Sequence, residues 1–237
     1  MKSIFTTCIP ALAIAMAAPL ALAQDPFVRG NAPPPAEVQA PPALSMTYEV
    51  FSLPLAEAAA LLRRDLEDAA THKELIARVA KNEAKQEAMA LIRGQSGQRV
   101  NADGVSEWII PTEFEPTLKS DASKPAPSSP AMPSAFETHT CGLILEFEPT
   151  LSQDQQRVTL RLAPTHRTLT GREKWGQGIS EIETPVLDEQ SINCVANSDV
   201  GSPCLIGTMT PPPGLKPDDK APKRVWLAFA TVDLVRR

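Results

Sequence analysis

The run from Ala135 to Pro164 constrains the fold of this chain more than any other segment. Apolar and polar residues alternate in it twice, once on each side of a polar turn. The apolar positions are Cys141, Leu143, Leu145 and Phe147 before the turn, and Val158, Leu160 and Leu162 after it. Alternation with a period of two is typical of a strand that buries one face. The segment therefore predicts two paired, half-buried strands, which form a scaffold and supply no reaction chemistry.

The N-terminus has the pattern of an export signal. Lys2 precedes an apolar stretch from Ile9 to Leu22, and Ala21-Leu22-Ala23 has the small-x-small pattern of a signal-peptidase site. We therefore expect residues 1–23 to be a signal peptide. A membrane anchor is the less favoured alternative, because the apolar stretch is shorter than the ~20 residues that a helical span needs. We expect no transmembrane helix in the mature chain.

Composition limits the partners and locates the linkers. The chain has 28 acidic and 23 basic residues, and its net charge of −5 disfavours binding to nucleic acid or to anionic lipid. Many of the 24 prolines fall in two segments without a periodic apolar face. We expect a disordered Pro/Ala-rich linker at 24–45 and a disordered loop at 117–134.

Residues 46–94 are predicted to form a mainly helical segment. A short strand at Tyr48 to Leu53 is followed by a helix with a narrow apolar stripe, and a second helix is expected from Thr71 to Arg93. The second helix would carry a face of small side chains, formed by Ile76, Ala80, Ala84, Ala88 and Leu91. This face predicts either a contact with a partner or close packing within the same domain.

Residues 95–237 are predicted to form a β-domain. A hairpin is expected at 95–116 with its turn at Ala102-Asp103-Gly104, because Asp-Gly is a favoured turn pair. Residues 165–178 are polar and contain three glycines, which predicts a loop. The last strand, from Val225 to Val232, is apolar on both faces and is the best candidate for a central element.

Several of these segments together resemble the secretin domain. From Glu137 to Leu162 a glycine precedes an alternating strand, Pro-Thr ends that strand, and a second strand follows a polar turn, as in the C-terminal half of that domain. Other matching pieces occur in the family's order: Ser96 to Val100, Pro111-Thr112, Ser191 to Val195, Cys204 to Thr208, and a final hydrophobic strand. Thr208 stands where the family tends to carry a second glycine.

Secretins are ring-forming outer-membrane proteins of bacterial type II and type III secretion, type IV pilus assembly and filamentous phage export. Together with the helices expected at 46–94, the resemblance predicts an α+β fold, with a small N-terminal helical part followed by a mainly antiparallel secretin-like β-domain. It also implies a non-enzymatic structural or assembly component of the bacterial envelope, in the periplasm or outer membrane. The expected partners are further copies of the chain or other secretion components. The alternative is a soluble periplasmic protein-binding module that kept the fold without forming a pore.

Three cysteines follow the predicted signal peptide, and an exported protein can form disulfides. Cys194 and Cys204 flank a turn-rich segment, so they either face each other across a hairpin as a disulfide or stay as separate buried thiols. Cys141 lies on the apolar face of its strand and is expected to be a small core residue.

No residue pattern predicts catalysis or a cofactor. The histidines, His72, His139 and His166, have no metal-ligand spacing and are interpreted as scattered surface residues. Glu146 and Glu148 share a strand face, which is interpreted as solvated. Trp175 stands among charged residues and glycines, so it either anchors a partner or belongs to a loop folded over the sheet. We therefore expect no enzyme activity, no metal and no cofactor.

Overall fold

The computed structural model of this protein describes residues 41–115, 132–175, 181–213 and 222–235. The predicted signal peptide and the predicted linker as far as residue 40 lie outside the described residues. The predicted loop at 117–134 also lies outside them as far as residue 131. Both predicted disordered segments are too long at their C-terminal ends, because residues 43–45 and 132–134 already belong to strands.

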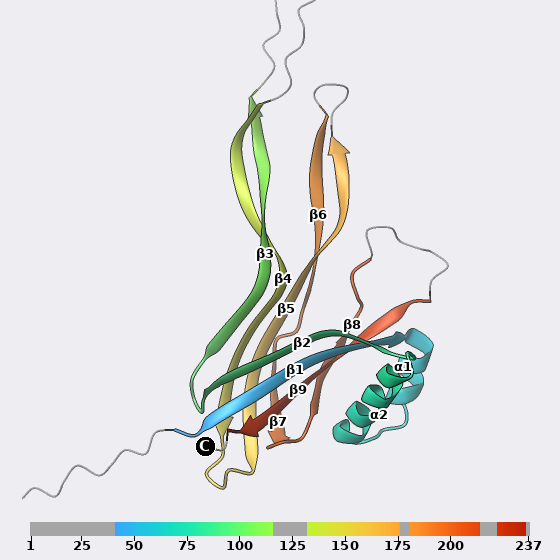
Figure 1. Ribbon diagram of the computed structural model, residues 1–237, viewed down its shortest axis with the longest axis vertical. Coiled ribbons are helices and arrows are strands. Elements are labelled where there is room, and N and C mark those ends of the chain that lie inside the picture. Colours follow the sequence, from blue (N-terminus) through green and yellow to red (C-terminus); the bar gives the residue numbers. More distant parts are fainter. Residues whose placement is uncertain (1–40, 116–131, 176–180, 214–221, 236–237) are drawn as a thin grey trace, which may run out of the picture. The chain divides into compact units, whose positions relative to one another are not determined.

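Four antiparallel strands of the described chain form one sheet, which we call sheet A (Figure 1). Their order across the sheet is β2 (Lys85–Gln95), β1 (Ala43–Pro54), β9 (Arg224–Leu234) and β8 (Cys204–Met209). β9 lies between β1 and β8, and residues on both of its faces are buried. The prediction of a central last strand is therefore confirmed.

The remaining described strands form sheet B, which is also antiparallel. Its main path is β3 (Val100–Glu115), β4 (Met132–Leu151), β5 (Arg157–Trp175) and β6 (Ile182–Ser191), while β7 (Cys194–Asp199) pairs with the first part of β5. The alternating segments at 141–148 and 158–162 are parts of β4 and β5, as predicted. The predicted α+β class with mainly antiparallel strands is confirmed.

Sheet A has a core on each of its faces. Alternate residues of β1 and β9, among them Tyr48 and Trp226, pack against Leu145, Phe147 and Leu160 of sheet B. On the other face Phe51 and Phe229 pack under two helices, α1 (Leu55–Leu62) and α2 (Asp68–Ala80). Figure 1 shows the helices and sheet B on opposite faces of sheet A. Neither helix in the described part of the chain is long and apolar enough to cross a membrane.

The predicted second helix is wrong in its C-terminal half. α2 ends at Ala80, and the segment at 85–95 pairs with β1 as a strand. Asn82 adopts φ +60°, and the N–H groups of Glu83 and Ala84 both point back to the carbonyl of Arg78. A residue in the left-handed region after a last helical turn ends a helix, and asparagine is among the few residues that adopt it readily.

Two predicted breaks in the β-domain are also wrong. The expected turn at Ala102-Asp103-Gly104 lies inside β3, where Gly104 pairs with Leu143 of β4. The expected polar loop from Thr165 continues β5 as far as Trp175 and pairs with β6. From Arg167 onwards β5 extends beyond the core between the sheets, where no apolar alternation is required.

Candidate functional site

Sheet B has two unpaired edges within the described residues. β3 pairs only with β4, so the other side of its 16 residues carries backbone N–H and C=O groups without a neighbouring strand. The second edge is formed by β6 and β7, which pair with successive parts of β5 on the side away from β4. Open edges are templates for pairing with another strand. An edge at each side of one sheet allows head-to-tail association of identical chains.

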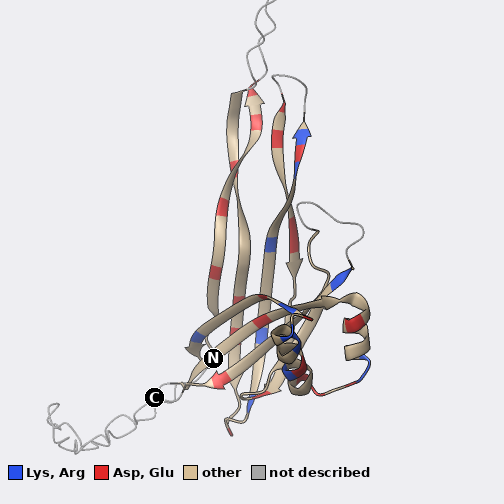
Figure 2. Cartoon of the chain, turned by 45° about the vertical axis from the view of Figure 1, so that its right-hand side comes forward, with Lys and Arg blue, Asp and Glu red and all other residues tan. Residues whose placement is uncertain are grey.

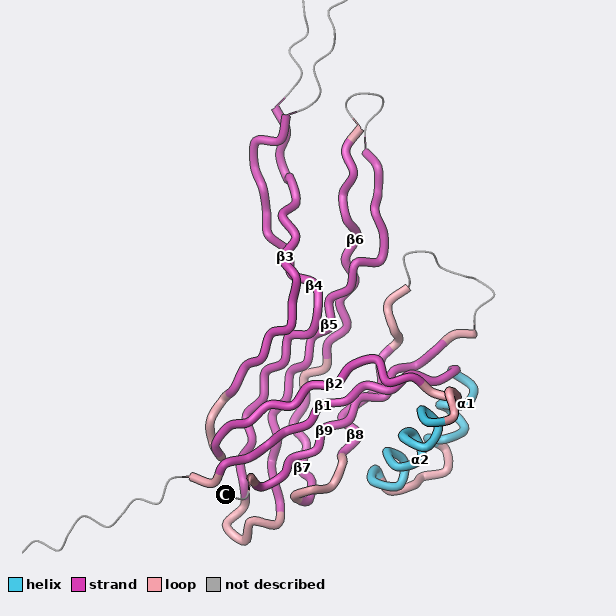
Figure 3. The backbone as a smooth tube through the Cα atoms, viewed as in Figure 1, coloured by secondary structure: helices cyan, strands magenta, loops and turns pink. Residues whose placement is uncertain are grey.

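Sheet B divides into two ribbons at one end. Pairing between β4 and β5 stops at Gly142 and Arg167, but β3 continues with β4 and β5 continues with β6 (Figures 1 and 3). We call residues 105–115 with 132–141 the β3–β4 arm, and residues 167–175 with 182–190 the β5–β6 arm. Ile110 is the only buried apolar side chain in the described residues of the two arms.

A groove of about 490 Å³ lies between the arms. Ile110 and Phe114 line it from the β3–β4 arm, and Trp175 and Ile182 line it from the β5–β6 arm. The guanidinium of Arg172 stands 5.6 Å from the ring centre of Trp108, so the arms approach each other within side-chain reach. Trp175 is the last residue of β5 and is 60% exposed. It therefore lies at the end of a strand and not in a loop, and its role as a partner contact stays a prediction.

The other predicted contact residues do not share one helix face. Ile76 and Ala80 lie on α2, Ala84 is buried in the turn after it, and Ala88 and Leu91 lie on β2. Ala88 packs against the core between the sheets, whereas Leu91 is exposed on the opposite face of sheet A. The predicted alanine face is therefore wrong as a single surface, since only its first two members belong to a helix.

Cys194 and Cys204 begin strands in different sheets, β7 in sheet B and β8 in sheet A. The hairpin expected between them is therefore wrong. Burial raises the pKa of the Cys204 thiol to about 11, with smaller contributions from Asp68 and from Cys194 itself. Both thiols and that of Cys141 are free in this structure. The disulfide stays a prediction. If it formed, it would link sheet B to sheet A and not the two strands of one hairpin.

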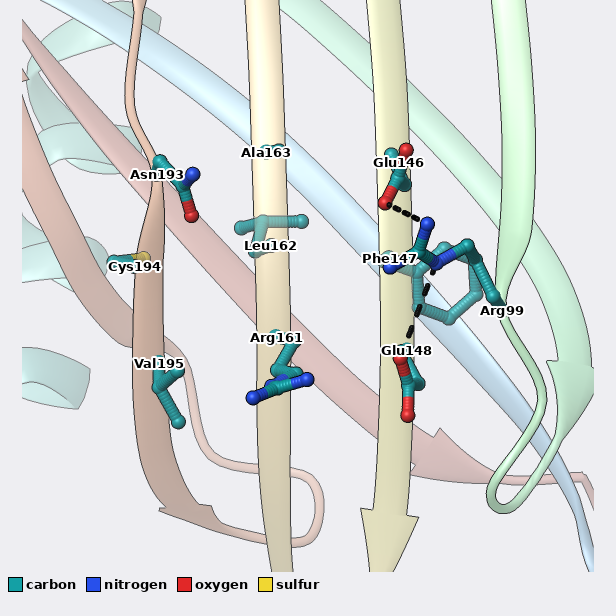
Figure 4. Close-up of a pocket in the computed structure, with 10 residues that line it drawn as sticks. All are labelled: Arg99, Glu146, Phe147, Glu148, Arg161, Leu162, Ala163, Asn193, Cys194 and Val195. Carbon is teal, nitrogen blue, oxygen red and sulfur yellow. Dashed lines mark ion pairs between the residues drawn. The ribbon is translucent and has the colours of Figure 1, made fainter.

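Glu146 and Glu148 lie beside a shallow pocket of about 220 Å³ on sheet B (Figure 4). Nη1 of Arg99 is 3.1 Å from one carboxylate and Nε is 4.0 Å from the other. Arg161 and Asn193 complete the polar lining. A single guanidinium between two acids balances their charge in part, which is typical of an ion-paired sheet surface.

The surface interpretation is wrong for two of the histidines. His72 is largely covered: its Nε2 lies 2.7 Å from Glu49, and its ring packs edge-on against Phe51 and Phe229.

His166 is buried between the sheets, where Nε2 lies 2.9 Å from the hydroxyl of Tyr48 and the ring packs edge-on against Trp226. Its pKa is lowered by burial. The sequence signal that could have identified His166 as buried is its spacing from Leu160 and Leu162. It lies an even number of positions from both, so all three lie on the same face of β5. No cluster of three or more metal-binding side chains occurs in the described ranges.

The described chain is thus an α+β protein with open strand edges and an apolar groove between two arms. No protein-family model matches it, and no curated protein matches it. Similar solved structures include the InvG secretin domain β-barrel from the Salmonella SPI-1 injectisome, with 10% identity, a TM-score of 0.42 and 83% of this chain covered. ExeD of Aeromonas hydrophila has 11% identity, a TM-score of 0.43 and 84% covered.

A third similar structure is the type IV competence pilus secretin PilQ of V. cholerae, with 15% identity, a TM-score of 0.40 and 83% of this chain covered. The chain spans only part of each of these proteins: 64% of the InvG chain, 50% of the ExeD chain and 62% of the PilQ chain.

Proposed function

We propose that this protein is a non-enzymatic structural or assembly component of the bacterial envelope that works as an oligomer, in the manner of part of an outer-membrane secretin serving protein secretion or pilus export. The observation that carries the proposal is the pair of open edges on sheet B, β3 on one side and β6 with β7 on the other. The ordered sequence pieces that resemble the secretin domain support the same class. An exported location is supported by the predicted signal peptide.

Association through strand edges uses backbone groups, so it does not require reactive side chains on sheet B. In such an assembly the backbone of β3 in one copy would pair with the β6 or β7 edge of the next, and the same contact repeated would close a ring. Side chains then need only to keep the strands straight and soluble. The ion pairs of Arg99 with Glu146 and Glu148 fit this role, because they hold two acids on the sheet surface as salt bridges.

Proline substitutions at neighbouring positions of β3 test the edge directly. Backbone groups of successive strand residues point to opposite sides, so of Ser106 and Glu107 one faces β4 and the other faces the open edge. Ser106→Pro and Glu107→Pro should therefore differ: one variant lowers the melting temperature, and the other keeps it but loses oligomers. Light scattering after size exclusion, with and without detergent, measures the mass. A strict monomer at high concentration in both conditions contradicts the proposal.

A second candidate, a soluble periplasmic module that binds a protein partner, is favoured by the groove beside Trp175. Membrane fractionation separates the two candidates. Heat-resistant multimers in the outer-membrane fraction support the oligomer, and a freely released monomer supports the binding module.

A further inference from the structure

The groove between the arms is open on an apolar surface that the chain itself does not cover in the described residues. Ile110 is only 7% exposed at its base, whereas Trp175 is 60% exposed at its rim. Lining residues come from both arms, and the backbones of the arms are not hydrogen-bonded to each other at this level. An occupant would therefore bury an exposed tryptophan, and buried tryptophan is among the residues that contribute most to binding.

Acidic residues lie on the same strand faces as the groove lining. Glu137 stands directly opposite Ile110 in the β3–β4 pairing, and directly opposed residues share a face. Glu173 stands directly opposite Thr184, which lines the groove, and lies two residues from Trp175 on β5. Each arm thus presents one carboxylate beside its apolar residues.

The arms as a whole are acidic (Figure 2). The β3–β4 arm contains Glu107, Glu113, Glu115 and Glu137 and no lysine or arginine. In the β5–β6 arm each basic side chain is already paired with an acid: Arg167 with Glu189, Arg172 with Glu183, and Lys174 with Glu181. For Glu173 and Asp188 the described residues provide no ion-pair partner. The described residues of the two arms therefore carry a net negative charge, and Glu137 also lies 3.5 Å from Nε2 of His139, which lines the groove.

This charge selects among occupants. The arm of a second copy would bring glutamates onto glutamates, and an anionic lipid surface would be repelled in the same way. A cationic occupant would be attracted. The arms are strand ribbons within side-chain reach of each other, so a flat, extended segment fits between them better than a helix of about 10 Å diameter.

We propose that the groove between the β3–β4 and β5–β6 arms binds an extended peptide segment of another protein in which large apolar residues alternate with lysine or arginine. The apolar side chains of the peptide contact Trp175, Phe114 and Ile182, and the basic side chains reach Glu137 and Glu173. This partner site goes beyond the oligomer of the proposed function, and the two are separable because the edge of β3 and the groove involve different atoms.

Three short fluorescein-labelled peptides test the site on the full chain: alternating lysine and leucine, alternating glutamate and leucine, and alternating lysine and serine. Fluorescence anisotropy should detect binding of the lysine–leucine peptide, with the other two weaker by at least about tenfold because each lacks one half of the recognition. Added salt should weaken the binding, since part of it is electrostatic.

Variants then locate the peptide. Trp175→Ala should lower the affinity by about tenfold or more, and Glu137→Gln with Glu173→Gln should lower it and reduce its salt dependence. Ile109→Ala is the matched control, since Ile109 is 70% exposed on the reverse face of the β3–β4 arm; this variant should leave the affinity within about twofold. Trp175 and Ile109 are exposed, so neither change threatens the fold.

The proposal is overturned if the lysine–leucine peptide does not bind, if the glutamate–leucine peptide binds equally well, or if Ile109→Ala weakens binding as much as Trp175→Ala. Self-association without peptide that Trp175→Ala abolishes would assign the groove to a second copy and overturn the proposal as well. If the β3 proline variant loses oligomers but keeps its peptide affinity, the edge of β3 forms the oligomer and the groove binds the peptide independently of it.

Discussion

The hydroxyl oxygen of Tyr48 lies 2.9 Å from Nε2 of His166, in the core where sheet A meets sheet B. The two residues are 118 positions apart in the sequence, so this hydrogen bond ties the first strand of sheet A to the middle of sheet B. The residues that stand directly opposite His166 in the neighbouring strands are Leu143 of β4 and Gln190 of β6, and Trp226 of β9 covers its ring. None of these groups carries a charge that would stabilise an imidazolium.

The stability of the fold should therefore fall when His166 is protonated. Burial holds the pKa of His166 below its ordinary value of 6.5, so the unfolded chain binds this proton more readily than the folded protein. The free energy of unfolding should decrease as the pH falls through 6.5 and level off, for this group, below the folded-state pKa. Tyr48 stays protonated throughout, because burial raises its pKa.

Urea unfolding of the wild type and of His166→Gln at about pH 8 and about pH 5 measures this effect. The variant should be the less stable protein at the higher pH, and the gap between the two should narrow at the lower pH, because proton uptake by this imidazole in the unfolded chain destabilises the wild type alone. A gap that stays constant or widens on acidification contradicts the assignment.

Gly142 should be intolerant of any side chain. It adopts φ +139°, and a Cβ there would lie 2.1 Å from the carbonyl oxygen of Gly104 and 2.9 Å from Cα of Val105. Gly142→Ala would push β3 away from β4 at the point where the arms begin, so we expect a loss of at least about 2 kcal/mol in the free energy of unfolding. Denaturant unfolding gives the value.

Gly97 supplies the control for this experiment. It also has a positive φ, +80°, but nothing lies within 4 Å of a Cβ built there. Gly97→Ala should cost only the backbone strain, about 1 kcal/mol. Equal losses in the two variants would mean that strain alone, and not the close approach of the strands, requires glycine at 142.

Gly104 illustrates which parts of the fold the sequence could predict. Asp103-Gly104 has the composition of a hairpin turn, and a local pattern contains no sign that Gly142, 38 positions later, needs the space beside it. The strands at 141–148 and 158–162 were predictable because each buries one face, which local alternation records directly.

β2 and the groove were not predictable for a different reason. Met89 and Leu91 are apolar on the exposed face of β2, and Ala88, Ala90 and Ile92 are apolar on its buried face, so the segment has no clean period of two and also fits a helical stripe. Only pairing with β1 decides between them. The groove joins residues of four strands, which no local pattern brings together. Trp175 was recognisable as exposed, but its neighbours Phe114 and Ile110 were not.

Ser52 should be required at the end of β1. Its buried hydroxyl accepts hydrogen bonds from Nε and Nη2 of Arg224 at 3.1 and 2.9 Å and donates one to Glu87 at 2.5 Å. Three strands of sheet A meet at this one oxygen. Ser52→Ala leaves the guanidinium and the carboxylate without their shared partner, so we expect a loss of about 1–3 kcal/mol in the free energy of unfolding.

Thermal unfolding followed by circular dichroism checks the Ser52 prediction. Ser45→Ala, in the same strand and only half-buried, is the control and should stay within about 0.5 kcal/mol of the wild type. If the two alanine variants melt together, the hydrogen bonds of Ser52 contribute nothing net to stability.

A disulfide between Cys194 and Cys204 should form slowly and should stabilise the contact between the sheets. Burial raises the pKa of both thiols, so little thiolate is present at neutral pH to attack an oxidant. With oxidised glutathione as oxidant, the two thiols lose two electrons and two protons, and one glutathione disulfide becomes two glutathione thiols. The closed loop is short, so the expected gain is about 3 kcal/mol in the free energy of unfolding.

Peptide mapping without reductant should find the 194–204 link in the wild type and in Cys141→Ser, and not in Cys204→Ser. Recovery of glutathione adducts alone, or of links through Cys141, would mean that the two sheets do not hold these sulfurs in bonding geometry.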